Sequence, residues 1–180
     1  MIHLITGGSG SGKSEYAENM LCHYQKEEGE QLIYIATMFP CGEETKRKIR
    51  RHQRMRRGKG FETIERYTNL AGIVDVLKSY ESVSVLIECI SNLAANELYM
   101  EEGAKESTAE EILTGIEAVC RIARNVVIVT NEVSSEGFFC SPEMIRYKQV
   151  MGEINCCLAK RADRVTEVVY GIAVEVKKDR

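Results

Sequence analysis

Residues 2–14 read IHLITGGSGSGKS. A short apolar run leads into a glycine-rich loop that ends in Lys13 and Ser14, which matches the G-x-x-x-x-G-K-[ST] pattern of a phosphate-binding loop. The glycines let successive backbone N–H groups point inward at phosphate oxygens, and the N-terminus of a following helix adds its positive dipole end. The loop lies directly between an apolar strand pattern and a helical pattern, which argues against a chance glycine-rich turn. The stretch therefore predicts a nucleotide site.

Length and composition indicate an ordinary globular chain. Its 180 residues fit one domain, expected to span 1–180, and 44% are hydrophobic and 28% charged. No apolar run reaches the roughly 18 residues that a membrane span needs, and MIHLITGG at the N-terminus is too short for a signal peptide. The seven cysteines form no Cys-x-x-Cys pair. We therefore expect a cytoplasmic protein with reduced thiols and no membrane span.

Short apolar runs alternate with helical patterns along the chain. Strands are expected at 2–6, 32–37, 83–89 and 126–132, with one or two closing strands within 165–177 and a bend at Gly171. Helices are expected at 14–26, 45–57, 70–79 and 142–160, from residue 90 into Met100, and from Ser107 or Thr108 onward. Strands that are apolar throughout are buried on both faces. This pattern indicates the α/β class, with a mostly parallel sheet covered by helices.

A phosphate-binding loop also needs groups that handle the phosphates and their metal ion. Lys13 is expected to reach the β- and γ-phosphates, and the Ser14 hydroxyl to ligate Mg²⁺. An acidic partner commonly comes from the end of another strand. Glu88 and Glu132 both end apolar strand patterns, where a parallel strand delivers a side chain to the ligand-binding edge of the sheet. Either carboxylate could instead be a strand-end residue that faces water.

The stretch 46–59, KRKIRRHQRMRRGK, gathers nine of the chain's 24 basic residues around His52, although the net charge is −3. If residues 45–57 form a helix, Lys48 and Arg56 lie on the face of His52. Nearby cations lower the pKa of an imidazole, and the neutral imidazole is the nucleophilic form. The same cations would attract a triphosphate and stabilise a phosphorylated histidine.

Three interpretations of this segment remain open from its residues alone: a solvated basic helix, a nucleic-acid surface, or a histidine that attacks phosphorus. Against nucleic acid, the segment has no interleaved aromatic residues and the pI is about 5.8. His3 and His23 have no supporting pattern, and we interpret both as structural.

These segments together resemble the bifunctional adenosylcobinamide kinase/adenosylcobinamide-phosphate guanylyltransferase family of cobalamin biosynthesis. The resemblance covers nearly the whole chain in the same order. It rests on ITGGSGSGKS, LIYIAT, KIRRHQRMR, ETIE, LIECISNLAANEL, VVIVTNEV and the closing MGEINCCLAKRADRVTEVVYGIAVEVK. It implies a RecA-like three-layer P-loop NTPase fold with a mostly parallel central sheet, and assembly as a homotrimer.

The resemblance also implies two reactions. In the first, the γ-phosphate of ATP or GTP moves onto the aminopropanol hydroxyl of adenosylcobinamide. In the second, His52 attacks the α-phosphorus of GTP, and the guanylyl-histidine passes GMP to adenosylcobinamide phosphate, which gives adenosylcobinamide-GDP. Two alternatives stay open: an enzyme with only one of these activities, or a RecA-like nucleic-acid-binding ATPase module. The bifunctional hypothesis requires no nucleic acid.

The resemblance assigns site residues one by one. His52 and Lys13 are the catalytic residues, and Mg²⁺ is held by Ser14, with Glu88 as a possible second ligand. The expected nucleotide contacts are Gly7, Gly8, Ser9, Gly10, Ser11, Gly12, Lys13, Ser14, Ala36, Thr37, Met38, Gln53, Arg54, Met55, Arg56, Glu65 and Glu88.

The chain departs from the family pattern at three places. Lys48 stands where the family usually has arginine, which keeps the charge but loses the bidentate fork. At 134–144 the chain reads SSEGFFCSPEM, where the family usually has a short glycine-rich turn leading to Val-Pro. If this loop contacts the corrinoid, the change affects the substrate preference or the kinase activity. NCCLAKRAD, at 155–163, lacks a glutamine that often follows the asparagine.

Overall fold

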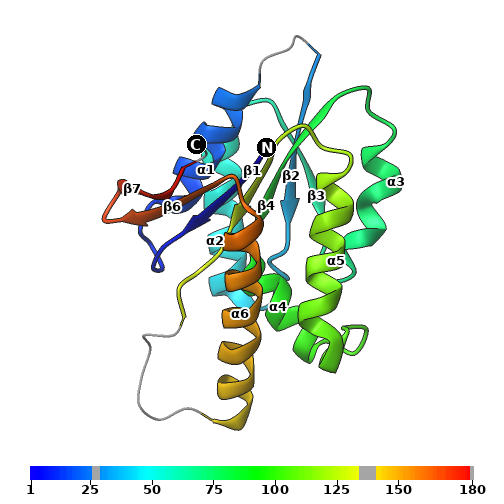
Figure 1. Ribbon diagram of the computed structural model, residues 1–180, viewed down its shortest axis with the longest axis vertical. Coiled ribbons are helices and arrows are strands. Elements are labelled where there is room, and N and C mark those ends of the chain that lie inside the picture. Colours follow the sequence, from blue (N-terminus) through cyan, green and yellow to red (C-terminus); the bar gives the residue numbers. More distant parts are fainter. Residues whose placement is uncertain (26–28, 134–140, 179–180) are drawn as a thin grey trace.

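The computed structural model describes residues 1–25, 29–133 and 141–178. Within them, seven strands form one sheet in the order β3-β2-β4-β5-β1-β6-β7 (Figure 1). All neighbouring strands are parallel except β7, which runs antiparallel to β6. The strands are β1 (Ile2–Thr6), β2 (Gln31–Ala36), β3 (Phe61–Glu65), β4 (Val83–Glu88), β5 (Val126–Val129), β6 (Arg164–Val169) and β7 (Ile172–Lys177).

Helices cover both faces of this sheet. The helical elements are α1 (Lys13–Tyr24), α2 (Gly42–Arg56), the 3₁₀ turn η1 (Leu70–Ile73), α3 (Val74–Leu77), α4 (Ile90–Tyr99), the 3₁₀ turn η2 (Lys105–Ser107), α5 (Thr108–Cys120) and α6 (Pro142–Arg161). In Figure 1, α5 and α6 lie in front of the sheet and α2 lies behind it. Among the described residues, no helix has the length and apolar character needed to cross a membrane.

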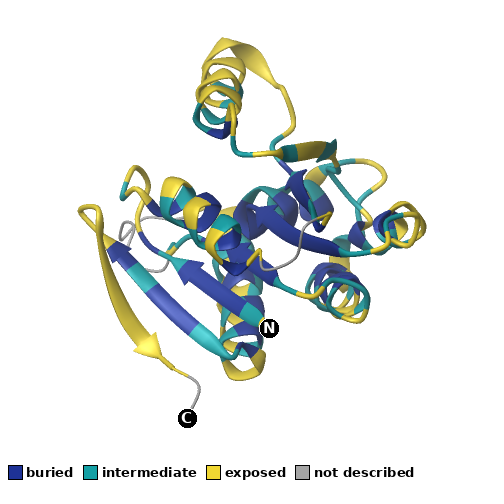
Figure 2. Ribbon diagram, turned by 90° about the horizontal axis from the view of Figure 1, so that it is seen from above, coloured by how far each residue is buried: buried dark blue, intermediate teal, exposed yellow. Residues whose placement is uncertain are grey.

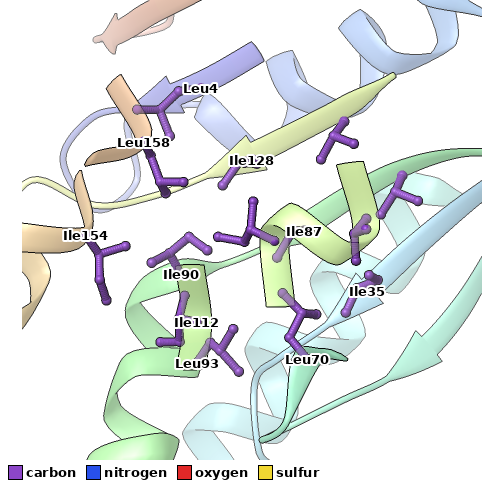
Figure 3. Packing of buried hydrophobic residues seen from close by; sticks show 14 of the residues in the cluster. Leu4, Ile35, Leu70, Ile87, Ile90, Leu93, Ile112, Ile128, Ile154 and Leu158 are labelled. Atoms are coloured by element: carbon purple, nitrogen blue, oxygen red, sulfur yellow. The ribbon is translucent and has the colours of Figure 1, made fainter. Parts of the chain in front are cut away.

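The central strands are buried on both faces because successive side chains point to opposite sides of a strand. In β4, Leu86 packs with the cluster that contains Leu21 of α1, whereas Ile87 packs with the cluster under α4, α5 and α6. Figure 3 shows the second cluster, in which Ile87 and Ile128 of the sheet meet residues of these helices. Burial on both faces confirms the predicted α/β class and the mostly parallel sheet.

Some element boundaries differ from the expectations. The strand β3 was not predicted, because it is an edge strand that leaves much of FETIE exposed and lacks an apolar run. The strand expected at 126–132 ends at Val129, and the helix expected at 70–79 consists of η1 and the four-residue α3. Gly171 does form the predicted bend, with φ +80° in the turn between β6 and β7.

The helix α2 stands away from the body of the protein and is largely exposed (Figure 2). Its C-terminal end is nonetheless anchored. Lys59, between Gly58 and Gly60, donates from Nζ to Oε2 of the fully buried Glu18 at 2.8 Å and to Oδ1 of Asn19 at 2.9 Å. This tether fixes the last turn of α2 against α1.

The tether gives a first testable prediction. Lys59→Met leaves a buried carboxylate without its cation, so we expect the free energy of unfolding to fall by about 3 kcal/mol in urea titrations. Adding Glu18→Gln to Lys59→Met should restore part of the loss. Lys46→Met, which breaks an exposed pair with Glu43, is the matched control and should have a much smaller effect. Additive effects in the double variant would contradict a direct pair.

In β1, an inner strand between β5 and β6, His3 is fully buried in a hydrogen-bonded chain. Arg164 donates to the Tyr24 hydroxyl at 3.3 Å, this hydroxyl is hydrogen-bonded to Nδ1 of His3 at 2.9 Å, and Nε2 of His3 is hydrogen-bonded to Oγ1 of Thr166 at 2.8 Å. Burial, with a smaller contribution from the Arg164 charge, lowers the pKa of His3 from 6.5 to about 4. His3 is therefore a neutral structural residue at physiological pH, as interpreted from the sequence.

This lowered pKa predicts the direction of a pH effect on stability. Between pH 6.5 and about 4 the unfolded chain binds a proton at His3 that the folded chain does not. Stability therefore falls as the pH falls through this interval. In denaturant titrations, the free energy of unfolding of His3→Gln should fall less over this pH interval than that of the parent chain. The carboxylates titrate in both proteins, so their contribution cancels in the comparison. Equal slopes would show that His3 is not the group responsible.

Candidate functional site

The predicted phosphate loop joins β1 to α1. Gly7, Gly10 and Gly12 all have positive φ, and a Cβ at Gly7 would lie 2.4 Å from the carbonyl oxygen of Val168. Glycine is required here, because any other residue would be strained by the positive φ and, at Gly7, its Cβ would clash with the backbone of Val168. Lys13 folds back over the loop, where its Nζ donates to the carbonyl oxygen of Gly8 at 2.9 Å.

Ser14 and Glu88 meet beside this loop. The Ser14 hydroxyl donates to Oε1 of Glu88 at 2.8 Å, and Oε2 of Glu88 is buried without a hydrogen-bond partner. Burial raises the pKa of Glu88 to about 7. A hydroxyl next to a carboxylate with a free oxygen is a donor set that suits Mg²⁺. Glu132, the other candidate, is exposed three residues beyond β5 and lies outside the two hollows described below.

A phosphate hollow of about 190 Å³ lies between this loop and α2. One wall is formed by residues 9–15 of the loop and the first turn of α1. The other wall is formed by Lys48, Arg51, His52 and Met55 of α2. The structure therefore brings together two segments, the phosphate loop and the basic helix, that lie some forty residues apart in the sequence.

An inner cavity of about 30 Å³ lies on the other side of His52, between α2 and the sheet. Its lining residues are Tyr34, Ala36, Met38, Ile49, His52, Gln53, Arg56, Thr63, Glu65 and Glu88. Most of them are among the predicted contacts. His52 lines both the phosphate hollow and the inner cavity, so it lies on the wall that the two share.

Four predicted contacts line neither space: Gly7 and Gly8 at the start of the loop, and Thr37 and Arg54. Thr37 is buried, and its hydroxyl donates to the carbonyl oxygen of Cys89 and accepts from the Cys89 N–H, both at 2.8 Å. Arg54 is exposed on the outer side of α2. Thr37 points away from the inner cavity that its neighbours Ala36 and Met38 line. Arg54 is half a helical turn from His52, so it lies on the opposite side of α2.

Several lining residues were not predicted. Tyr34 lies two residues before Ala36 on the same face of β2, and Thr63 lies two residues before Glu65 on β3. Period-two spacing from the predicted contacts could have found both. Arg51 was not singled out either, although it precedes His52 directly. The altered loop SSEGFFC, at 134–140, lies outside the described residues.

The surroundings of His52 favour its neutral form. Burial is the main cause of a pKa below 6.5, and the charges of Arg56, Arg51 and Lys13 lower it further. Lys48 was expected to contribute, but its Nζ forms an ion pair with Glu44 at 2.8 Å. Nδ1 of His52 is buried without a hydrogen-bond partner. The arrangement offers an uncharged, partly desolvated imidazole beside a phosphate-binding loop, which suits nucleophilic attack on phosphorus.

Solved structures with a similar fold were found at low sequence identity. A KaiC-like protein of Pyrococcus horikoshii aligns with a TM-score of 0.55 at 17% identity, covering 92% of this chain and 69% of that one. The ATPase domain of G40P aligns with a TM-score of 0.52 at 10% identity, covering 92% and 68%. These similarities confirm the predicted RecA-like P-loop fold.

Sequence comparisons reach the whole chain. The bifunctional adenosylcobalamin biosynthesis protein CobU of Escherichia coli is 32% identical, with 98% of this chain and 100% of that protein covered. CobU of Salmonella typhimurium is 30% identical with the same coverage. The model of the family described as cobinamide kinase / cobinamide phosphate guanyltransferase matches residues 3–176. The chain therefore belongs to the cobinamide kinase / cobinamide phosphate guanyltransferase family.

Proposed function

We propose that this chain catalyses both the phosphorylation of adenosylcobinamide by ATP or GTP and the transfer of GMP from GTP to adenosylcobinamide phosphate. One observation carries the proposal beyond family membership: His52 lies on the wall between the phosphate hollow and the inner cavity. A triphosphate held in the hollow has its phosphorus atoms beside a neutral imidazole, and this geometry favours the bifunctional reading over a kinase alone.

In the kinase step, the loop N–H groups and Lys13 would hold the phosphates of the donor. Ser14 and Glu88 would hold Mg²⁺, which neutralises charge on the β- and γ-phosphates when bound. The aminopropanol hydroxyl of the acceptor attacks the γ-phosphorus, the bond to the bridging oxygen breaks, and the nucleoside diphosphate leaves. The hydroxyl proton is released in the same step.

In the transfer step, the unprotonated ring nitrogen of His52 attacks the α-phosphorus of GTP. A P–N bond forms, the bond to the bridging oxygen breaks, and pyrophosphate leaves with that electron pair. A phosphate oxygen of adenosylcobinamide phosphate then attacks the same phosphorus, and the electron pair of the P–N bond returns to the ring. Because the acceptor oxygen is already anionic, the acceptor has no proton to lose in this step.

We also propose that the protein acts in the cytoplasm as a homotrimer that does not bind nucleic acid. All residues of β7 are exposed, and Ile172 and Val176 are 68% and 63% exposed. Exposed apolar edge strands are sites of association between chains. Against nucleic acid, α2 carries no aromatic residue, and its cations Arg51 and Arg56 line the phosphate hollow and the inner cavity.

The first prediction of this proposal concerns the covalent intermediate. GTP labelled at the α-phosphorus should leave label on the protein that is stable to alkali and labile to acid. His52→Asn should abolish the label, while His23→Asn, at an exposed position on α1, should keep it. Since burial and the neighbouring cations lower the pKa of His52 from 6.5, the decline of labelling on acidification should be centred below pH 6.5. Label retained in His52→Asn would show that the nucleophile is another group.

The second prediction concerns assembly. Replacing Ile172 and Val174 by aspartate should convert a trimer to monomers in sedimentation experiments, because charge is placed on the apolar face of β7. Val76→Asp alters a comparably exposed valine on α3 and should leave the assembly unchanged. A trimer that survives the double change would place the interface elsewhere.

A further inference from the structure

Arg56 is unusual among the nine basic residues of the stretch 46–59, because it is buried, with 8% of its surface exposed. Its guanidinium carbon lies 3.5 Å from the centre of the Tyr34 ring, and its Nη2 donates to the Thr63 hydroxyl at 3.2 Å. The third nitrogen group, Nη1, is buried without a hydrogen-bond partner. A buried guanidinium N–H without an acceptor is costly, so such a group calls for an anionic partner.

No carboxylate of the described residues supplies that partner. Glu65 and Glu88 line the same inner cavity, yet neither forms an ion pair with Arg56. Glu65 accepts a hydrogen bond from the Tyr67 hydroxyl at 2.6 Å, and Glu88 accepts one from Ser14. The Arg56 charge acts on Glu88 only at a distance, where it partly offsets the raised pKa of that carboxyl, and Nη1 itself has no hydrogen-bond partner.

We infer that Tyr34 and Thr63 position Arg56 so that its Nη1 binds a non-bridging oxygen of the phosphorus that His52 attacks. The inference rests on the proposed guanylyl transfer and deepens it. Arg56 follows His52 by four residues, so the two side chains lie on one face of α2, and both line the inner cavity. A phosphorus bonded to His52 would lie beside the cavity that Arg56 also lines.

The sheet supplies a rigid support for this arginine. Tyr34 of β2 and Thr63 of β3 are register partners in neighbouring parallel strands, so the ring and the hydroxyl come from adjacent positions on one face of the sheet. The ring fixes the plane of the guanidinium through a cation–π contact, and the hydroxyl fixes its rotation. Together, the contacts with the Tyr34 ring and the Thr63 hydroxyl fix the orientation of Nη1.

Such a fixed cation contributes most when charge develops on the phosphorus. During attack the P–N bond forms while the bond to pyrophosphate breaks, and negative charge is carried by the non-bridging oxygens. A preorganised donor at that place stabilises the transition state without a cost of reorientation, and loss of one such donor typically lowers kcat by roughly 10²- to 10³-fold. The same cation also lowers the pKa of His52 and so keeps the attacking ring neutral.

A purely structural role for Arg56, in which it only fastens α2 to the sheet, makes a different prediction. In that case, replacing Arg56 would slow both reactions equally, because α2 would no longer be held beside the phosphate loop that both reactions use. Binding of the transferred phosphorus would affect guanylylation far more than phosphorylation, because the γ-phosphoryl transfer does not involve His52. The two roles are therefore separable by comparing the two reactions in one protein.

The experiment measures the single-turnover rate of protein labelling by GTP labelled at the α-phosphorus, alongside phosphorylation of adenosylcobinamide by ATP. Arg56→Met and Tyr34→Leu should each slow labelling at saturating GTP by about 10²-fold or more. Thr63→Val should slow it by a smaller factor. Arg50→Met, at an exposed position of the same helix that lines neither the phosphate hollow nor the inner cavity, is the matched control and should label within about threefold of the parent. Phosphorylation should change far less in all four.

A second readout is the pH profile of labelling. The charged groups around His52 are Lys48, Arg51 and Arg56 of its own helix, Lys13 and Glu15 of α1, and Glu65 and Glu88 on the opposite wall of the inner cavity. Removing the Arg56 charge should raise the pKa of His52, so the acid limb of the profile should move to higher pH in Arg56→Met. Arg56→Lys, which keeps the charge but not the fork, should leave the limb in place and still label slowly.

The outcomes separate this inference from the function on which it rests. If the parent chain forms no guanylyl adduct, the proposed function fails. If the parent is labelled but Arg56→Met and Tyr34→Leu are labelled at the parent rate, the function stands and the inference is overturned. Equal losses of labelling and phosphorylation, with an unmoved acid limb, would assign Arg56 a structural role and also overturn it.

Discussion

The site depends on one attachment: the last turn of α2 is fixed to the body of the protein while the rest of the helix is exposed to solvent. Arg56 stacks on Tyr34 of the sheet, and Lys59 reaches the buried carboxylate of Glu18 on α1. These contacts lie at and just beyond the end of the helix, one turn from His52. Because they hold that end in place, the imidazole lies between the phosphate hollow and the inner cavity.

The attachment also explains how an acidic chain builds a cationic site. The net charge is −3, yet the charges that act on the pKa of His52 are those of Lys13, Arg51 and Arg56. Burial and these cations act in the same direction on the ring, since both disfavour the imidazolium. The opposite holds at Glu88, where burial raises the pKa and the cations only partly offset it. One small volume thus contains a neutral base and a carboxylate that a metal ion or a proton can neutralise.

Much of the fold was predictable because its signals are local. The phosphate loop is a contiguous motif, and strands that are apolar throughout indicate a sheet buried on both faces. The edge strand β3 escaped prediction because FETIE is half exposed, and only pairing with β2 makes it a strand. The site divides in the same way. His52 and the loop were found from contiguous residues, whereas the Tyr34–Thr63 support depends on strand register. The residue pattern left Glu88 and Glu132 open, the family resemblance singled out Glu88, and the structure places Glu88 beside Ser14.

The most direct test of the account is to observe the bond between His52 and phosphorus. Protein labelled with ¹⁵N in its histidines and incubated with GTP should show coupling of a single ³¹P nucleus to one ring nitrogen. The coupled ring should be that of His52. Before GTP is added, the ¹⁵N chemical shifts of the same ring should show that it is neutral at pH 7. Coupling to His3 or His23, or no coupling while GTP is consumed and adenosylcobinamide-GDP is formed, would contradict the central claim.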